Sequence, residues 1–499
     1  MTYFLDTLVW MFTPQVLLTL TLGVFGGLIV GAVPGLTSTM AVGLLVPITF
    51  GMDAQFGIAM LVAVYVGAIS GGLVSAVLLN IPGTPSSVAT TFDGFPMAKN
   101  GQAGRALSLG IWSSFIGGTV SAIALAVIAP QLAKFAIKFS PYEYFALVIF
   151  TLTCIGVLSK GSTLKGLIAG CIGLLLSFVG TSWTDSVTRF TFGVSALEAG
   201  FAELPVLIGM FAMTQILQDV SQISKPFTVL KPNFTIREFG QVIVESASHI
   251  GNFARSSLIG IVIGILPGVG PGLSNILAYA QAKTASKHPE TFGKGEPDGI
   301  IASETANNAA TGGAMIPLLT LGIPGDATTL MMLGAFMIHG IQPGPLLFRD
   351  SGAMVMAVIA VFFLCNFLMM LIQMFCIPVF VKCLLVPRYL LYPVVLVMCI
   401  VGCYALNSRM LDVWVFVGFG LVGYFLSREG FPLLPVILGL ILGRMAENQF
   451  RVGLAISNGS IMPFITRPVS ALLLLAAVLS LILPPILEKR HARKAQKAI

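Results

Sequence analysis

The stretch Leu321-Gly-Ile-Pro-Gly-Asp-Ala-Thr-Thr-Leu330 has a near-copy in Leu79-Asn-Ile-Pro-Gly-Thr-Pro-Ser-Ser-Val88. Each stretch follows a long apolar segment, breaks at Pro-Gly and then offers two adjacent hydroxyl side chains. Pro and Gly interrupt a helix, and the Asp or hydroxyl residues after them can cap a new one. Inside a membrane such a break is tolerated only where it packs in protein or lines a cavity. Two breaks at corresponding positions of two halves predict the binding site of a transporter.

The composition indicates an integral membrane protein. The chain has 499 residues, of which 56% are hydrophobic and only 9% are charged, whereas about a quarter of the residues of a soluble chain are charged. Its 54 glycines and 28 prolines suit a bundle of membrane helices, in which both residue types are common. The sequence therefore predicts an all-α polytopic membrane protein.

The net charge of +7 does not indicate a nucleic-acid partner, because part of it lies in a basic C-terminal tail. That tail contains Lys489, Arg490, Arg493, Lys494 and Lys497. A basic tail directly after an apolar segment predicts a cytoplasmic C-terminus. No Lys or Arg precedes Val16 and no small-residue cleavage site follows the first apolar run, so we expect an uncleaved first span near 16–33 whose start faces outside.

Metal chemistry and catalysis are not expected. The seven cysteines lie in or beside apolar segments with no CxxC motif, which is typical of packing residues. The four histidines show no paired metal-ligand spacing, and no Walker motif is present. We also find no convincing nucleophile with its base, so an enzyme or an ATPase is disfavoured.

An internal repeat organises the chain. Three matches keep their order, with offsets of 233 (267 − 34), 242 (324 − 82) and 230 (430 − 200) residues. They pair Gly31-Ala-Val-Pro-Gly35 with Gly264-Ile-Leu-Pro-Gly268, Ile81-Pro-Gly83 with Ile323-Pro-Gly325, and the ten residues from Gly200 with the ten from Gly430. The expected organisation is a first transmembrane repeat at 1–218, a linker and amphipathic segment at 219–250, a second repeat at 251–445, and an extra C-terminal helix with the basic tail at 446–499.

The two repeats are expected to be inverted relative to each other. If the N-terminus is outside and the basic interval 218–237 is inside, the first half crosses the membrane an odd number of times. An odd count inverts the second half, which is the architecture of many alternating-access transporters. Arg444, Arg451 and Arg467 would then lie outside, which weighs against the inversion.

A family resemblance rests on several of these segments: Gly31-Ala-Val-Pro-Gly-Leu-Thr37, the run from Asn80 to Pro96, Gly264-Ile-Leu-Pro-Gly-Val-Gly-Pro-Gly272, Ser303-Glu-Thr-Ala-Asn-Asn-Ala-Ala-Thr-Gly-Gly313 and the Gly-Ile-Pro-Gly-Asp run. Together they resemble the TctA-type large membrane subunit of bacterial tripartite tricarboxylate transporters. The resemblance covers essentially the whole chain. It implies ion-gradient-driven secondary uptake of a tri- or dicarboxylate across the inner membrane. It also implies two partners, a small TctB-like membrane subunit and a periplasmic TctC-like solute-binding protein.

The four breaks supply the candidate substrate site. A carboxylate that enters the membrane loses its hydration, and helix N-termini can replace those hydrogen bonds with free N–H groups. The candidate residues are Pro34, Gly35, Thr37, Ser38, Asn80, Pro82, Gly83, Thr84, Ser86, Ser87, Pro267, Gly268, Gly270, Pro324, Gly325, Thr328 and Thr329. Thr90 and Thr91 could add further hydroxyl donors. The alternative for every hydroxyl is ordinary capping or bonding to the preceding turn, and the alternative for the Gly-rich pair of breaks is a tight kink.

A polar stripe in the second half provides candidates for a coupling ion. Glu304, Asn307, Asn308 and Thr311 share one helical face, and a carboxylate in a membrane helix is a functional hypothesis by default. Their oxygens suit sodium, whereas Glu304 alone could carry a proton; no other cofactor is expected. The alternative is an interfacial glutamate at the start of a helix. Asp326 is either a further coupling residue or simply a helix N-cap.

Two other charged residues have more ordinary interpretations. Asp93, in Phe-Asp-Gly-Phe-Pro, is expected in a turn or loop. Arg255 is expected to anchor its segment at the membrane interface rather than to bind substrate. A stand-alone carrier or a channel for small anions, without a binding protein, remains the alternative to the tripartite transporter; duplicated but non-identical halves favour a carrier over a channel.

Overall fold

The computed structural model describes residues 2–158, 162–182, 185–220, 229–230, 232–386 and 388–496. Lys225, Pro226 and Lys231 of the predicted basic interval, and Lys497 of the predicted tail, lie outside these residues. The chain forms two compact units, each made of two segments. Unit 1 contains Met1–Lys134 and Phe211–Arg409, and unit 2 contains Phe135–Met210 and Met410–Ile499. The repeat boundaries expected from the sequence stay a prediction.

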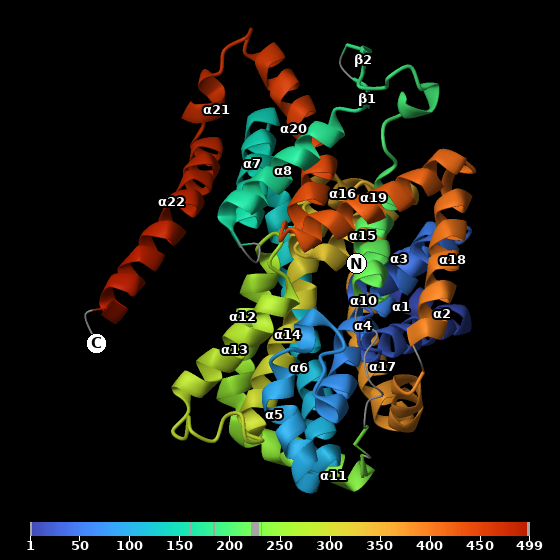
Figure 1. Ribbon diagram of the computed structural model, residues 1–499, viewed down its shortest axis with the longest axis vertical. Helices are drawn as coiled ribbons and strands as arrows, with labels where there is room; N and C mark the ends of the chain where they lie inside the picture. The colour runs from blue at the N-terminus through green and yellow to red at the C-terminus, as the bar shows by residue number, and fades with distance from the viewer. Residues whose placement is uncertain are drawn as a thin grey trace. The chain divides into compact units, whose positions relative to one another are not determined.

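Helices make up nearly all of unit 1 (Figure 1). In chain order they are α1 (Thr2–Met11), α2 (Pro14–Ala32), α3 (Ser38–Thr49), α4 (Ala54–Leu79), the short turn η1 (Pro85–Ser87), α5 (Thr90–Met97), η2 (Ala98–Gln102), α6 (Ala103–Ala136, whose last two residues belong to unit 2), α10 (Thr214–Val220), α11 (Ile236–Ser246), η5 (Ala247–His249), α12 (Ile250–Ile265), α13 (Pro271–Ala285), α14 (Pro297–Leu321), α15 (Ala327–Ile338), α16 (Pro345–Asp350), α17 (Gly352–Leu384) and α18 (Arg388–Asn407).

Unit 2 contains the helices α7 (Pro141–Leu158), α8 (Thr163–Ser177), α9 (Glu203–Ile208), α19 (Met410–Arg428), α20 (Leu433–Ile456), α21 (Met462–Thr466) and α22 (Pro468–Gln496), the strands β1 (Gly180–Thr181) and β2 (Thr188–Arg189), and the turn η3 (Ser195–Leu197). The segment η4 (Gly209–Met213) crosses the unit boundary. The strands pair antiparallel, with Gly180 opposite Arg189.

The prediction of an all-α polytopic membrane protein is confirmed. Among the described residues, six helical stretches are long and apolar enough to cross a membrane: Pro14–Ala32, Ala54–Leu79, Thr90–Ala136, Gly352–Leu384, Tyr389–Asn407 and Met410–Arg428. In the same part of the chain, the only strands are the two-residue pair β1 and β2. The protein is therefore a multi-pass membrane protein.

Two buried helices, α4 and α14, form the centre of unit 1. Each packs closely against the second helix before it in the chain, α4 against α2 and α14 against α12. Glycines make these contacts close, because a β-carbon at Gly27 would clash with the carbonyl oxygen of Val64, and one at Gly264 with that of Ala310. Small residues spaced along a face let membrane helices approach until van der Waals contact holds them together.

Several arginines of unit 2 are paired with acids. Arg189 binds the carboxylate of Glu447 through two nitrogens, at 2.8 and 3.0 Å. Arg451 lies 3.0 Å from Asp185 and 2.9 Å from Glu447, and Arg467 lies 2.7 Å from Glu143. Two of the three arginines that weigh against inversion, Arg451 and Arg467, are thus partly neutralised by neighbouring carboxylates. The inversion itself stays a prediction.

A pair of adjacent glycines in α2 tests the close packing of α2 on α4. We expect Gly27→Ala to lower the unfolding free energy by about 1–3 kcal/mol, because its methyl group enters a filled contact. Gly26→Ala is the matched control, since a β-carbon at Gly26 meets nothing within 4 Å. Thermal unfolding of the purified protein in detergent measures both variants. Equal midpoints for the two would contradict the packing.

Candidate functional site

The four predicted breaks all occur as interruptions between helices of unit 1. They lie between α2 and α3, between α4 and η1, between α12 and α13, and between α14 and α15. At 1.5 Å per residue, the 12 residues of α3 extend about 18 Å, and the 12 residues of α15 extend the same distance. A bilayer core is about 30 Å thick, so neither helix is long enough to span it.

Local sequence explains how the second and fourth breaks form. Asn80 ends α4 in the left-handed conformation, with φ +58°, and Gly322 ends α14 in the same way, with φ +70°. Glycine, and more rarely asparagine, adopts this conformation at low cost. Thr84 and Asp326 then cap the next turns through reciprocal bonds with Ser87 and Thr329. Residues paired by the predicted repeat therefore have the same role in both halves.

Neighbouring breaks contact one another and form a ring. A β-carbon at Gly83 would clash with the Gly31 carbonyl oxygen, and the matched residues Gly325 and Gly264 show the same relation. The N–H of Gly268 donates to the Gly325 carbonyl oxygen at 2.8 Å. These contacts join the breaks within each half.

Two further contacts join the halves across the ring. The hydroxyl of Thr328 lies 2.8 Å from that of Ser38 and 3.2 Å from that of Thr39, which connects the fourth break to the first. The side-chain amide of Asn275 donates to the carbonyl oxygen of Ser86, which connects the third break to the second. The breaks thus supply hydrogen-bond partners for one another.

The predicted substrate residues belong to this ring or to the helix starts beside it, and several of their hydroxyls differ in what they bond. Ser87, Thr91 and Thr329 bond to the backbone of their own turn, as the capping alternative predicts. Ser38 and Thr328 instead bond across the ring. Hydroxyls of this second group could exchange a protein partner for a ligand without unwinding a helix.

Pro34, Pro82, Pro267 and Pro324 belong to the non-helical residues of the breaks, and Thr37 caps α3 by accepting from Met40 N–H at 3.2 Å. Gly35, Gly268 and Gly270 have φ of +95°, +78° and +65°, so the two Gly-rich breaks depend on residues without a β-carbon. Ser86 hydrogen-bonds the hydroxyl of Thr84 at 2.7 Å.

Glu304 lies in the eighth position of α14 and its side chain is fully buried in the protein. Its Oε1 accepts from the Thr90 hydroxyl at 2.5 Å and its Oε2 from the Ser114 hydroxyl at 3.1 Å. Both donors come from the first half, on α5 and α6. The carboxylate of one half is therefore satisfied by hydroxyls of the other.

The other polar residues of the stripe differ in whether their side chains are hydrogen-bonded. The Asn308 amide donates to the Glu304 carbonyl oxygen at 3.1 Å, and the Thr311 hydroxyl to the Asn308 carbonyl oxygen at 2.6 Å; both bonds are within α14. By contrast, the side-chain oxygen of Asn307 is buried without a hydrogen-bond partner among the described residues. Asn307 is thus the neighbour of Glu304 on this face whose oxygen is available to a ligand.

Asp326 is a buried N-cap that also binds a residue of the other half. Its Oδ1 accepts from the Thr329 N–H at 2.6 Å, and its Oδ2 accepts from the Tyr65 hydroxyl at 2.8 Å. The capping alternative is therefore correct for Oδ1, while Oδ2 is held by α4. Tyr65 lies in an otherwise apolar stretch of the sequence, where nothing signals that its hydroxyl binds a carboxylate.

A second tyrosine–aspartate pair lies at the first break and has no sequence signal. The Tyr392 hydroxyl donates to Asp219 Oδ2 at 2.6 Å, and Gln215 donates to Oδ1 at 3.1 Å. A β-carbon at Gly35 would clash with that carboxylate. Asp219 follows an apolar segment in the sequence, where it resembles an ordinary helix-end residue.

Asp93 was expected in a turn or loop, which is wrong. It lies in α5 and is fully buried. Its Oδ1 accepts from the N–H groups of Gly293, Gly295 and Glu296, each at 2.8 Å, and its Oδ2 accepts from the Tyr279 hydroxyl at 2.8 Å. Asp93 thereby fixes the polar loop before α14 to the helix that carries Thr90.

Paired helix breaks that meet inside a polytopic membrane protein are typical of membrane transporters. The sequence profile of the tripartite tricarboxylate transporter TctA family matches residues 17–438. The chain belongs to this family, which is a transporter family and not an enzyme family. The family resemblance noted in the sequence is confirmed.

Two relatives from Agrobacterium vitis are similar to the chain. One, called "Uncharacterized 52.8 kDa protein in TAR-I ttuC' 3'region", is 36% identical over 485 residues, or 96% of this chain and 95% of the relative. Another, called "Uncharacterized protein in TAR-II ttuC' 3'region", is 37% identical over 234 residues, or 46% of this chain and 97% of the relative. No solved structure matches the chain.

The Asp93 contacts predict that a single substitution frees the loop before α14. We expect Asp93→Ala to speed tryptic cleavage at Lys287 and Lys294 at least tenfold, since hydrogen bonds to a charged acceptor contribute about 1.5–3 kcal/mol each. Tyr279→Phe removes only one of the four bonds and is the control with a smaller effect. Cleavage of the native protein in detergent, followed by mass spectrometry, gives both rates. Identical rates for wild type and Asp93→Ala would refute the anchoring role.

Proposed function

We propose that this transporter takes up a tri- or dicarboxylate by alternating access, driven by an ion gradient. The observation that carries the proposal is the ring of four helix breaks, in which both halves contribute polar groups to one buried region. Membership of the TctA family supports a carboxylate as the substrate class. In this mechanism, one bundle carries the breaks past a scaffold and exposes them to either side in turn.

The substrate region is proposed at the contact of the first and fourth breaks. Both α3 and α15 begin there, and the start of a helix offers N–H groups and a positive dipole end to an anion. Ser38, Thr39 and Thr328 currently satisfy one another. A carboxylate could replace these mutual bonds, so that binding would leave no hydroxyl unsatisfied.

The coupling ion, sodium or a proton, is proposed at Glu304 and Asp326. Each carboxylate is buried in the second half and receives a hydroxyl from the first half, Thr90 for Glu304 and Tyr65 for Asp326. An unpaired buried carboxylate costs several kcal/mol, so separation of these pairs would require a proton or a cation to take the place of the lost donor. The free oxygen of Asn307 favours a ligand on the Glu304 side.

The proposed partners are a TctB-like small membrane subunit and a TctC-like periplasmic solute-binding protein, and the proposed location is the bacterial inner membrane with a cytoplasmic C-terminus. Family membership supports these partners. The names of the relatives, which place them 3′ of ttuC′, are compatible with a multi-component system.

Uptake by purified components tests the proposed function. We expect proteoliposomes with both membrane subunits to accumulate a radiolabelled carboxylate only when the binding protein and an inward sodium or proton gradient are present. Uptake without the binding protein would favour a stand-alone carrier. Gradient-independent flux at channel rates would exclude the carrier mechanism.

Two isosteric substitutions test the coupling residues. We expect Glu304→Gln and Asp326→Asn to reduce gradient-driven uptake at least tenfold and to flatten its dependence on sodium or pH. An amide carries no negative charge, so it neither attracts a cation as a carboxylate does nor takes up and releases a proton. Asp53→Asn is the matched control: Asp53 caps α4 at an exposed position, and asparagine caps a helix equally well. Unchanged ion dependence in both site variants would remove these residues from the coupling site.

A further inference from the structure

A pocket of about 240 Å³ lies outside the ring, where α12, α13 and α14 meet at one end of unit 1. Its polar lining comes from Ser248, His249, Asn252, Arg255, Ser286 and Asp298. None of these residues is needed by the transport mechanism proposed above. They combine one arginine and one histidine with hydroxyl and amide groups around one carboxylate.

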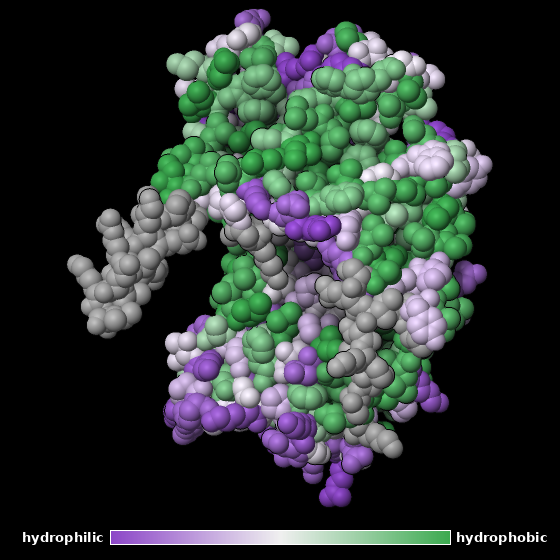
Figure 2. Space-filling view, in the orientation of Figure 1, coloured by the Kyte–Doolittle hydropathy of each residue, from purple (hydrophilic) through white to green (hydrophobic). Residues whose placement is uncertain are grey.

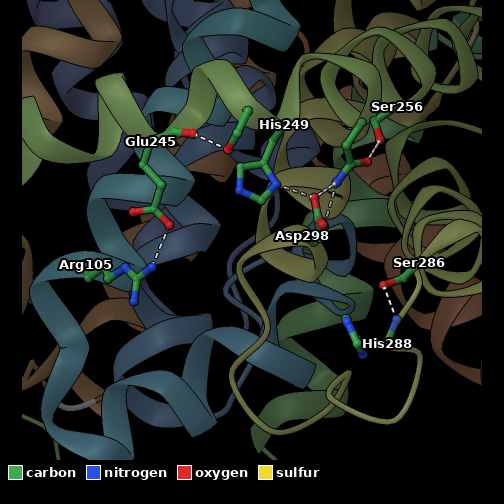
Figure 3. Close-up of polar contacts among 9 residues, drawn as sticks. Arg105, Glu245, His249, Ser256, Ser286, His288 and Asp298 are labelled. Atoms are coloured by element: carbon green, nitrogen blue, oxygen red, sulfur yellow. Dashed lines mark hydrogen bonds and ion pairs between the residues drawn. The ribbon is translucent and has the colours of Figure 1, made fainter.

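The wall of the pocket is fixed by Asp298 in the first turn of α14. Asp298 Oδ1 lies 2.9 Å from His249 Nδ1 and accepts from the Asn252 amide at 2.7 Å (Figure 3). The Asn252 oxygen in turn accepts from the Ser256 hydroxyl at 3.0 Å. The hydrogen bond to Asp298 raises the pKa of His249, and the charges of Asp298, Glu245 and Glu296 act in the same direction. His249 and Asn252 thus both contact the same oxygen of Asp298, which holds this carboxylate against the start of α12.

Arg255 provides the charge that the pocket leaves uncompensated. Nearby Arg105 is paired with Glu245 at 2.6 Å (Figure 3), and His249 is paired with Asp298. Among the described residues, no ion pair or hydrogen bond involves the exposed Arg255 side chain, although its charge acts on Asp298. The Ser286 hydroxyl accepts from the His288 N–H at 3.1 Å, which leaves its own proton for a ligand.

The pocket lies at a boundary between polar and apolar surface. On one side are the loop 286–296 and the amphipathic helix α11, where hydrophilic residues gather at the lower end of unit 1 (Figures 1 and 2). On the other side, α12 continues from Arg255 with exposed Leu258 and Val262, which share its face. On the neighbouring helix α13, Leu273 and Leu277 are also exposed. Val262 is seven residues beyond Arg255, or about 10 Å along the helix.

We propose that this pocket binds the phosphate-bearing headgroup of an anionic phospholipid, whose acyl chains lie along the apolar face of α12 and α13. A soluble anion would use the cationic end alone, whereas this site continues directly into a surface suited to hydrocarbon. Arg255 contacts the phosphate, Ser286 donates to it, and the Asp298–His249–Asn252 wall sets the shape of the pocket. Lys283 and Lys287 are exposed and are close in sequence to the lining residue Ser286. They add attraction for an anionic lipid surface.

Lipid titration of the purified full-length chain in detergent tests the proposal. We expect phosphatidylglycerol in mixed micelles to raise the unfolding midpoint in a saturable manner, because a ligand that binds only the folded state stabilises it. Phosphatidylcholine should not do so, since its headgroup carries no net charge. Inorganic phosphate should not do so either, because it has no acyl chains. Equal stabilisation by phosphatidylcholine or by inorganic phosphate would overturn the proposal.

Variants of one exposed arginine identify the site. We expect Arg255→Gln to weaken phosphatidylglycerol binding about fivefold, the effect of one basic side chain at an anionic lipid surface. Arg255→Lys should retain much of the binding, because it keeps the charge and loses only the planar donor geometry. The matched control is Arg237→Gln, an exposed arginine of α11 outside the pocket lining.

The lipid-free unfolding midpoint of each variant separates folding from binding, since the exposed Arg255 side chain makes no described ion pair that folding needs. A fivefold loss confined to Arg255→Gln supports the site. Equal losses in Arg255→Gln and Arg237→Gln would show a diffuse charge effect and overturn it. An unchanged affinity in Arg255→Gln would also overturn it.

Discussion

The structure of unit 1 depends on one constraint, that backbone polar groups cannot be left unsatisfied inside a bilayer. A helix that breaks within the membrane exposes N–H and C=O groups, and no water is present to bind them. Here the breaks satisfy one another, as in the bond from Gly268 N–H to the Gly325 carbonyl oxygen. Because Gly31 and Gly264 have no β-carbon, α4 can approach α2, and α14 can approach α12, closely beside the breaks. The broken helices therefore depend on the close packing of α2 on α4 and of α12 on α14, which brings partners to their free backbone groups.

This constraint explains why much of the fold could be predicted from the sequence. Helix breaks and caps are local, so Pro82-Gly83 and Pro324-Gly325 identify them without any knowledge of partners. The same local chemistry correctly predicts the N-cap role of Asp326, which binds Thr329 N–H. Membrane segments follow from composition and length, which explains why the polytopic class is confirmed. A short amphipathic helix after the linker is likewise observed as α11.

Long-range partners could not be predicted in this way. Asp93 accepts a hydrogen bond from Gly293 N–H, 200 residues further along the chain. Nothing near Asp93 in the sequence signals that acceptor role. Tyr65 stands in an apolar stretch, where only the fold brings its hydroxyl to Asp326. Asp219 resembles a helix-end residue until α18 brings Tyr392 to it. The sequence could therefore locate the breaks, but the identity of each donor depends on which segments meet.

The distribution of acids and donors suggests how binding and movement are linked. Glu304 and Asp326 both belong to the second half, whereas their hydroxyl donors Thr90, Ser114 and Tyr65 belong to the first. Any movement that separates α14 and α15 from α4, α5 and α6 breaks several of these bonds together. A carboxylate left without donors in a buried site is costly, so the separated state would favour a proton or a cation at each acid. In the proposed mechanism these resting contacts act as a restraint that ion binding replaces, and this replacement would couple the movement of the halves to the ion gradient.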